Sequence, residues 1–218
     1  MDHTVAMQRA IALAEKGLGK TAPNPIVGAV IIDAAGNVVG EGFHDRVNSP
    51  DHAEVVAIKA AGSKSVGATI VVTLEPCNHT GSTGPCVQAI IDAGITTVVF
   101  AVTDPNESAA GGAAALRAAG VTVIEGVLKD EAAFSNRAWL MKIKKGRPFF
   151  TWKVAATLDG KVAAADGTSK WISNETSRAD VQILRRQADA ILVGTNTVIT
   201  DDPHLIPRGD FPGYGANP

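Results

Sequence analysis

The chain has only two cysteines among its 218 residues, Cys77 and Cys86. Two cysteines can form at most one disulfide, and a chain of this length can bury about 70% of its unfolded surface, so no metal is needed merely to hold it together. Aromatic residues make up 5% of the sequence, and the formal net charge is -2. This composition argues against a basic, aromatic surface for nucleic acid.

Long apolar segments are also missing. No uninterrupted apolar run approaches the roughly 18 residues that span a bilayer, and residues 1–4 do not begin an export signal. We therefore expect a cytoplasmic protein with no membrane partner. A phosphate-binding loop is excluded as well, because Ala14 stands where the glycine before Gly19-Lys20-Thr21 would be required.

The apolar residues, 45% of the chain and rich in alanine and valine, favour an α/β fold with close helix–sheet contacts. Strands are predicted at 26–33, 38–43, 69–74, 96–102 and 121–124, with a hairpin between the first two. Helices are predicted at 5–16, 52–61, 86–93, 109–119 and 130–143. Because strands and helices alternate, we expect a largely parallel sheet with ligands at the carboxyl ends of its strands.

A basic stretch closed by glycine and proline, residues 142–148, marks a domain boundary. We expect one domain at 1–145 and a second at 146–218. In the second, the pattern predicts a strand at 149–156, a helix at 173–188 capped by Ser173, and a strand at 190–193.

Chemistry-bearing residues cluster in His52-Ala53-Glu54, Pro76-Cys77 and Pro85-Cys86. Two thiolates and an imidazole would give Zn²⁺ three protein ligands and leave one tetrahedral position open, as catalytic sites require. The layout resembles that of zinc-dependent nucleobase deaminases, in which a glutamate that is not a ligand moves protons. Glu54 is the candidate for that role. Pro85 suits a helix start, which would place Cys86 where a helix N-terminus lowers a thiol pKa.

Three other interpretations compete with this one. The cysteines could be small buried hydrophobic residues with His52 on the surface, although the ordered His-x-Glu and two Pro-Cys units make coincidence a poor explanation. A disulfide would need an oxidising compartment, for which the sequence gives no support. The zinc could be a structural clip in a non-catalytic module, but such sites normally have four protein ligands and no further cysteine is present.

Longer motifs identify a family. They are Pro23-Asn24-Pro25-Ile26-Val27-Gly28, Gly42-Phe43-His44, His52-Ala53-Glu54-Val55, Thr73-Leu74-Glu75-Pro76-Cys77-Asn78-His79 and Lys153-Val154-Ala155-Ala156-Thr157-Leu158-Asp159-Gly160-Lys161. From the first helix to about Arg208, the sequence resembles the bifunctional deaminase/reductase of riboflavin biosynthesis. The resemblance implies a cytidine-deaminase-like, three-layer α/β/α domain followed by the start of a dihydrofolate-reductase-like α/β domain.

For the first domain, the resemblance implies hydrolysis of the 2-amino group of 2,5-diamino-6-(5-phosphoribosylamino)pyrimidin-4(3H)-one. Zinc held by His52, Cys77 and Cys86 would activate water, and Glu54 would carry the protons. The substrate would be held by Asn24, His44 and His79. Expected partners are this small molecule and further copies of the chain.

Ser82 departs from the family pattern, since related sequences usually carry Lys or Arg there, a cation suited to the substrate phosphate. Lys20 and Arg46 are candidates to replace it. A deaminase acting on a free base, a nucleoside or tRNA is the rival within enzymes.

For the second domain, the resemblance implies an NADPH-dependent reduction of the ribosyl group to a ribityl chain. Matching positions assign the dinucleotide to Ala155, Trp171, Thr197 and Asp201. They assign the substrate to Lys153, Ser169, Arg185, Leu205 and Arg208. Because the family's reductase domain continues well beyond residue 218, we expect a truncated domain that reduces poorly or not at all.

Overall fold

The computed structural model describes residues 2–80, 83–106 and 109–209. The chain folds as two compact units, Met1–Phe149 and Phe150–Pro218. The division falls four residues after the boundary expected at position 145.

The first unit alternates helices with strands. Its strands are β1 (Gly28–Ile32), β2 (Val38–Phe43), β3 (Thr69–Leu74), β4 (Thr97–Val102) and β5 (Thr122–Glu125). Its α-helices are α1 (His3–Glu15), α2 (Ala53–Ala61), α3 (Cys86–Asp92), α4 (Gly112–Ala118), α5 (Lys129–Ser135) and α6 (Arg137–Lys145), and a 3₁₀ turn, η1 (Gly62–Ser65), follows α2.

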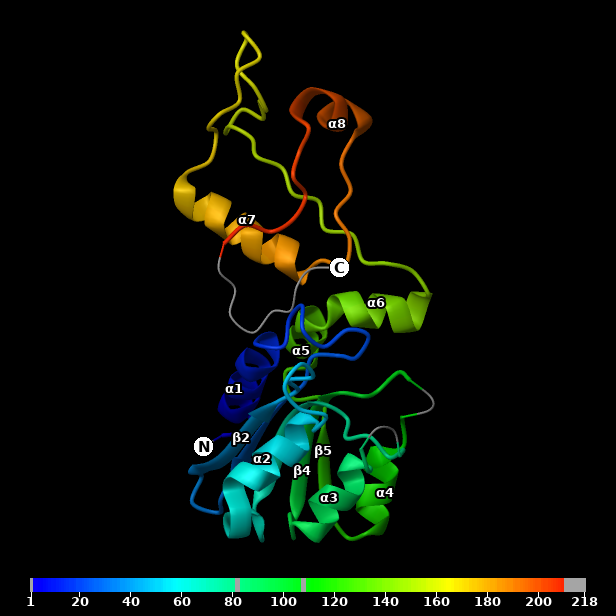
Figure 1. Ribbon diagram of the computed structural model, residues 1–218. Coiled ribbons are helices and arrows are strands. Elements are labelled where there is room, and N and C mark those ends of the chain that lie inside the picture. The colour runs from blue at the N-terminus through cyan, green and yellow to red at the C-terminus, as the bar shows by residue number, and fades with distance from the viewer. Residues whose placement is uncertain (1, 81–82, 107–108, 210–218) are drawn as a thin grey trace. The chain divides into compact units, whose positions relative to one another are not determined.

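Within the described residues the strands form one sheet in the order β2-β1-β3-β4-β5 (Figure 1). β1 pairs antiparallel with both β2 and β3, whereas β3, β4 and β5 are parallel. The predicted hairpin is confirmed, but the expectation of a largely parallel sheet is wrong for β1. The alternating pattern correctly predicts that α2 connects two strands of the same direction, β2 and β3. It does not reveal that β1 lies between these two strands in the sheet.

Helices cover both faces of the sheet. α1 packs on β1 and β3 and touches α5, whereas α2 packs on β2 and β1 and touches α3. Between these layers lie fully buried branched and aromatic side chains, among them Val30, Ile31, Val71, Val72 and Phe100. The expected three-layer α/β/α arrangement of the first domain is thereby confirmed.

The helix predicted at 130–143 is two helices, α5 and α6, that meet at Asn136. The Asn136 side chain accepts a hydrogen bond from the Ile26 N–H (3.0 Å) and donates one to the Ile26 carbonyl (2.7 Å). The side chain is therefore held by the segment that precedes β1. Apolar periodicity runs through both helices, so it could not locate this break.

Two glycines allow the close contacts that position the site elements. A Cβ on Gly42 would lie 2.5 Å from the Ala53 carbonyl oxygen, so only glycine lets the first turn of α2 rest on β2. A Cβ on Gly112 would lie 1.9 Å from the Pro76 carbonyl oxygen. The start of α4 thus presses against the segment that leads to Cys77.

The second unit contains α7 (Glu175–Gln187) and α8 (Thr195–Asp201), and no strand among residues 150–209. The strands predicted at 149–156 and 190–193 are wrong. Branched and aromatic residues suggested them, but the described part of this unit offers no neighbouring strand, and Phe150, Trp152 and Leu192 stay exposed. Helix α7 begins after Asn174 rather than Ser173, because the Asn174 side chain accepts the Ser177 N–H (2.8 Å).

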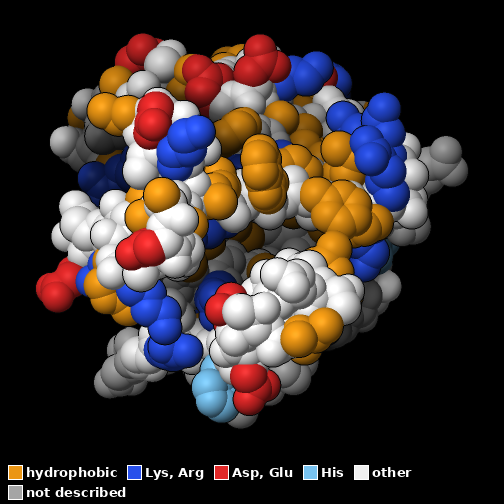
Figure 2. Space-filling view, turned by 90° about the horizontal axis from the view of Figure 1, so that it is seen from above, with side chains coloured by type: hydrophobic (Ala, Val, Ile, Leu, Met, Phe, Trp, Pro, Cys, Tyr) orange, Lys and Arg blue, Asp and Glu red, His pale blue; other side chains and the backbone are white. Residues whose placement is uncertain are grey.

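Exposed hydrophobic side chains are visible as orange patches in the space-filling view (Figure 2). Among the residues that the structure describes, no helix is both long and apolar enough to cross a membrane.

Candidate metal centre and catalytic cavity

One edge of the sheet collects the predicted site residues of the first unit. β2, β3 and β4 end at this edge, and β1 begins there because it runs in the opposite direction. The segment after β3 carries Cys77, α2 starts just after His52, and α3 starts at Cys86. The fold therefore converts three separate sequence motifs into one cluster.

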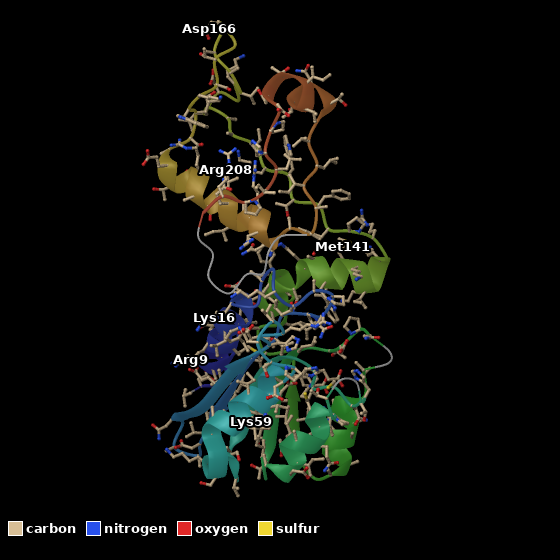
Figure 3. The ribbon with its side chains drawn as sticks, viewed as in Figure 1. Arg9, Lys16, Lys59, Met141, Asp166 and Arg208 are labelled. Atoms are coloured by element: carbon tan, nitrogen blue, oxygen red, sulfur yellow. The ribbon has the colours of Figure 1, made fainter. Side chains whose placement is uncertain are left out.

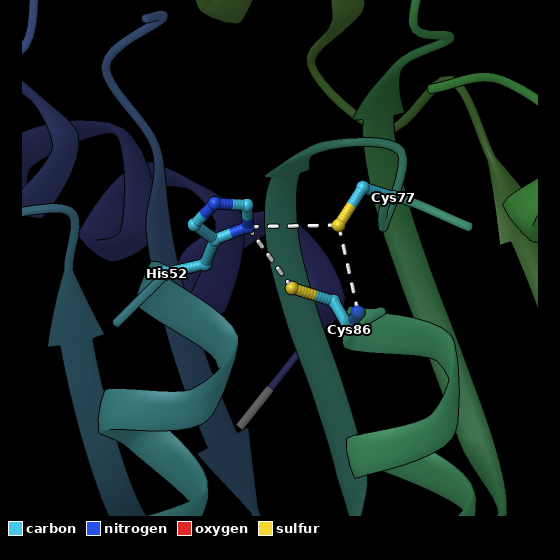
Figure 4. Close-up of side chains that lie close together, drawn as sticks. All are labelled: His52, Cys77 and Cys86. Atoms are coloured by element: carbon cyan, nitrogen blue, oxygen red, sulfur yellow. Dashed lines mark hydrogen bonds between the residues drawn. The ribbon is translucent and has the colours of Figure 1, made fainter. Parts of the chain in front are cut away.

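The three predicted metal ligands lie together (Figure 4). His52 Nδ1 is 3.2 Å from Cys86 Sγ and 3.5 Å from Cys77 Sγ, and all three ligand atoms lie within 4.8 Å of one another. Tetrahedral zinc with Zn–S near 2.3 Å and Zn–N near 2.0–2.1 Å would place nitrogen and sulfur about 3.6 Å apart. The donor set and its spacing fit one zinc ion with three protein ligands.

The two thiols of this cluster are electrostatically coupled. Hydrogen bonds from the Cys86 thiol and from His52 lower the pKa of Cys77 to about 4, against the opposing effect of burial. The bond to Cys77 and burial raise the pKa of Cys86. The lowering expected at Cys86 is therefore wrong, because Cys86 is buried and hydrogen-bonded to Cys77, while the Cys86 N–H at the start of α3 points to Cys77 Sγ (3.5 Å). The helix terminus favours the thiolate of Cys77 instead.

Glu54 lies in the first turn of α2, and only 4% of its surface is exposed. Burial raises the pKa of this carboxyl to about 7, although the neighbouring His52 opposes the shift. Glu54 lines a cavity of about 330 Å³ together with His52 and Cys77. A carboxyl with such a pKa can both accept and release a proton near neutral pH.

His44 and Asn24 form a pair on the wall of the same cavity. The Asp51 carbonyl lies 3.1 Å from His44 Nδ1, so this nitrogen carries the proton and donates it. Nε2 is then the acceptor for the Asn24 amide at 3.4 Å. Burial lowers the pKa of His44, which favours this neutral ring. The chain of bonds orients the Asn24 side chain.

His79 also lines the cavity, and its buried Nδ1 has no hydrogen-bond partner among the described residues. Asn24, His44 and His79, the predicted substrate-holding residues, thus share one cavity with the metal cluster. Ser82 lies outside the described residues. Arg46 lines a neighbouring cavity.

The cavity has further walls that the sequence did not reveal. Glu75 and Asp104 follow the ends of β3 and β4, and Trp139 and Ile143 belong to α6. The Glu75 carboxylate accepts hydrogen bonds from the Asp104 N–H (3.2 Å) and the Ala113 N–H (2.9 Å), tying three segments together. Position at the ends of parallel strands could have pointed to both acids. Nothing in the sequence marked residues of α6 as a wall of the cavity, because the direction of this helix depends on the break at Asn136.

Residues predicted for a dinucleotide and its substrate lie in the second unit, and the structure joins only some of them. Arg185 donates to the His204 carbonyl (3.2 Å), beside Leu205, and the Arg208 N–H donates to the side chain of Gln182 on α7. Trp171 stacks on the Arg178 guanidinium at 4.6 Å. Thr197 and Asp201 share helix α8.

No hydrogen bond or ion pair within the described part of this unit joins Lys153, Ala155 or Ser169 to the others. Without a strand in residues 150–209, these positions do not form a sheet-based cradle for NADPH. The arrangement of residues 150–209 therefore supports no hydride transfer from NADPH.

Comparisons with known proteins agree with the site. The family described as cytidine and deoxycytidylate deaminase zinc-binding region matches residues 1–102, and the family described as RibD C-terminal domain matches residues 148–211. The class of protein is therefore a cytidine-deaminase-like zinc domain joined to a segment of a RibD C-terminal domain.

Individual relatives narrow this class. The riboflavin biosynthesis protein RibD of Mycobacterium tuberculosis is 52% identical over 204 residues, which cover 93% of this chain and 60% of the relative. The solved structure of Acinetobacter baumannii RibD superimposes with a TM-score of 0.84 at 45% identity, covering 95% of this chain and 58% of that one.

A structure from Thermotoga maritima, described as a diaminohydroxyphosphoribosylaminopyrimidine deaminase/5-amino-6-(5-phosphoribosylamino)uracil reductase, gives a TM-score of 0.85 at 45% identity, covering 92% of this chain and 58% of that one. Over 92–95% of its own length the chain is similar to RibD proteins, and it spans somewhat under two thirds of the length of these relatives.

Proposed function

We propose that this chain catalyses the zinc-dependent hydrolytic deamination of 2,5-diamino-6-(5-phosphoribosylamino)pyrimidin-4(3H)-one in riboflavin biosynthesis. The observation that carries the proposal is a buried glutamate, Glu54, in the same cavity as a His/Cys/Cys cluster spaced for zinc. The substrate is inferred from the relatives, one of which is named for this reaction.

His52, Cys77 and Cys86 would hold the metal. When bound there with one position open, zinc supplies a Lewis acid that makes water acidic enough to react near neutral pH. The α3 N–H directed at Cys77 helps to keep that sulfur a thiolate and therefore a ligand.

Glu54 would move the protons. Hydrolysis adds one water at the ring carbon that carries the amine and breaks the C–NH₂ bond, so the two protons of the water must pass to a ring nitrogen and to the departing amine, which leaves as ammonia. A carboxyl with a pKa of about 7 is suited to both directions of transfer. Its burial beside His52 keeps bulk water from carrying those protons instead.

Asn24 and His79 would orient the pyrimidine. His44 holds the Asn24 amide so that its oxygen remains available to a ring N–H, while the unpartnered His79 Nδ1 can bond a polar atom of the substrate. Trp139 on α6 supplies a flat apolar wall against which a planar ring can pack.

A Glu54→Gln substitution tests this assignment. It keeps the shape of the side chain but removes the proton carrier, so ammonia release should fall by about 10²- to 10⁴-fold with the zinc content unchanged. Glu131→Gln, an exposed change on α5, is the matched control and should leave both quantities alone. A Glu54→Gln protein that retains zinc and full activity would favour a structural zinc module.

Substrate choice needs a separate comparison. Ammonia release from the phosphoribosyl pyrimidine should exceed that from free cytosine, cytidine, guanine or tRNA adenosine, and equal rates with any of these would overturn the substrate assignment. We place the reaction in a reducing compartment such as the cytoplasm, because both cysteines must remain unpaired thiols to bind the metal.

The proposal does not extend to the reduction. Residues 150–209 contain two helices and no strand, so we expect no NADPH oxidation by this 218-residue chain when it is supplied with the deaminated product. Oxidation of NADPH at the rate of the deamination would contradict this expectation.

A further inference from the structure

A second cavity adjoins the catalytic one. It has a volume of about 400 Å³ and is formed largely by residues 46–50, the segment between β2 and α2. Asn24, His44 and His52 line both cavities. A ligand longer than one ring can therefore reach from the metal cluster into this second space, here called the outer cavity.

The two cavities carry opposite charges. The catalytic cavity is lined by the carboxyl groups of Glu54, Glu75 and Asp104, and no Lys or Arg is among its described lining residues. The outer cavity has the guanidinium of Arg46 and no Asp or Glu in its described lining. A dianion would thus be repelled at the inner end and attracted at the outer one.

Arg46 is positioned and its charge is not neutralised. One guanidinium nitrogen donates to the Ala22 carbonyl oxygen (2.5 Å), which leaves the other donors of the fork for a ligand. Among the described residues, Arg46 makes no ion pair. The three acids within five residues of Arg46 have other partners: Glu41 pairs with Arg9, Asp45 accepts from Asn48 (2.8 Å), and Asp51 pairs with Lys59 (2.5 Å).

The outer cavity also contains a neutral hydrogen-bond donor, the hydroxyl group of Ser49. The hydroxyl oxygen of Ser49, which also lines the outer cavity, accepts the Asp51 N–H (3.2 Å). Its own O–H is therefore oriented by the backbone and can be donated elsewhere. A planar guanidinium together with a hydroxyl matches the several acceptor oxygens of a phosphate monoester.

We propose that the outer cavity binds the phosphate group of the substrate through Arg46, while the pyrimidine occupies the catalytic cavity. This inference rests on the proposed function, because that function supplies a substrate with a ring at one end and a phosphate monoester at the other. It goes further by assigning the phosphate to one cation and by setting the orientation of the bound substrate.

The test compares two substrates and four proteins. Ammonia release is measured from the phosphorylated pyrimidine and from its dephosphorylated riboside, with the wild type, Arg46→Gln, Arg46→Lys and Arg9→Gln. Arg9, labelled in Figure 3, is the matched control. This arginine lies on α1 and pairs with Glu41.

Loss of a charge-assisted contact should raise KM for the phosphorylated substrate by about 10- to 100-fold in Arg46→Gln, with little change for the riboside. Arg46→Lys should retain part of the preference, because it keeps the charge but loses the fork. Arg9→Gln should behave as the wild type.

Equal losses on both substrates would show that Arg46 acts only by holding the Ala22 carbonyl, and would overturn the inference. No loss on either would overturn it too. A wild type that releases no ammonia would instead refute the proposed function. In that case calorimetric titration with ribose 5-phosphate decides: binding by the wild type that Arg46→Gln abolishes supports the site, and undetectable or unchanged binding refutes it.

Discussion

The Asn136 side chain makes two hydrogen bonds to the backbone of Ile26, in the segment before β1. It satisfies both the N–H and the carbonyl of Ile26, 110 residues away in sequence, and Asn136 and Ile26 are only 6% and 5% exposed. An Asn136→Ala substitution leaves both backbone groups buried without a partner. Each such group costs about 1–3 kcal/mol, so we expect a loss of roughly 3 kcal/mol once partial access of water is allowed for.

Thermal unfolding of the zinc-loaded chain measures this loss. At about 2–4 °C per kcal/mol for a protein of this size, the melting temperature should fall on the order of 10 °C. Asn136→Asp should be at least as damaging, because it removes the donor and points a carboxylate at the Ile26 carbonyl. Asn48→Ala is the control, an exposed asparagine bonded to Asp45.

A functional readout accompanies the stability change. Ile26 follows Asn24 and Pro25, so release of this segment should raise KM for the substrate more than it lowers kcat. The structural reasoning would be refuted if the free energy of unfolding of the Asn136→Ala protein lay within about 0.5 kcal/mol of that of the Asn48→Ala control.

Three further predictions concern the site. Gly112→Ala should displace the Pro76 carbonyl and thereby weaken zinc binding, which competition with a chromogenic chelator measures. Gly84→Ala is the control and should not weaken zinc binding, because the space around Gly84 is open. Equal zinc affinities of the two variants would contradict the packing argument. Burial lowers the pKa of His44 in the folded chain below the unfolded value of about 6.5. The neutral His44 ring therefore contributes fully to the free energy of unfolding above about pH 6.5, and this contribution is lost as the pH falls from there through the lowered pKa. His44→Gln should reduce the change in the free energy of urea unfolding with pH in this range. An unchanged dependence on pH would argue against a role of His44 in it. Removal of zinc by a chelator should lower the melting temperature and abolish ammonia release, and both should return on readdition; activity that survives complete removal would exclude a metal mechanism.

Some features of this protein follow from residue types and their order alone. Two thiols and an imidazole are rare enough, and specific enough in their chemistry, that His52, Cys77 and Cys86 identified a zinc site before any geometry was known. The hairpin of β1 and β2 was equally local, because turn residues between two apolar runs define it. Both signals are carried by short segments whose physical meaning does not depend on distant parts of the chain.

Other features are decided by contacts between distant segments. The place of β1 between β2 and β3, the break at Asn136 and the entry of Trp139 into the cavity depend on partners far away in sequence. The same holds for the thiol pair, since the hydrogen bond between the two sulfurs lowers the pKa of Cys77 and raises that of Cys86, and the α3 N–H also points to Cys77. The strands predicted in the second unit failed for the same reason: a β-strand is completed by a neighbouring strand, and residue propensity cannot supply one. The sequence by itself thus determined which atoms could bind the metal, whereas the tertiary structure decided which walls, charges and hydrogen bonds surround them.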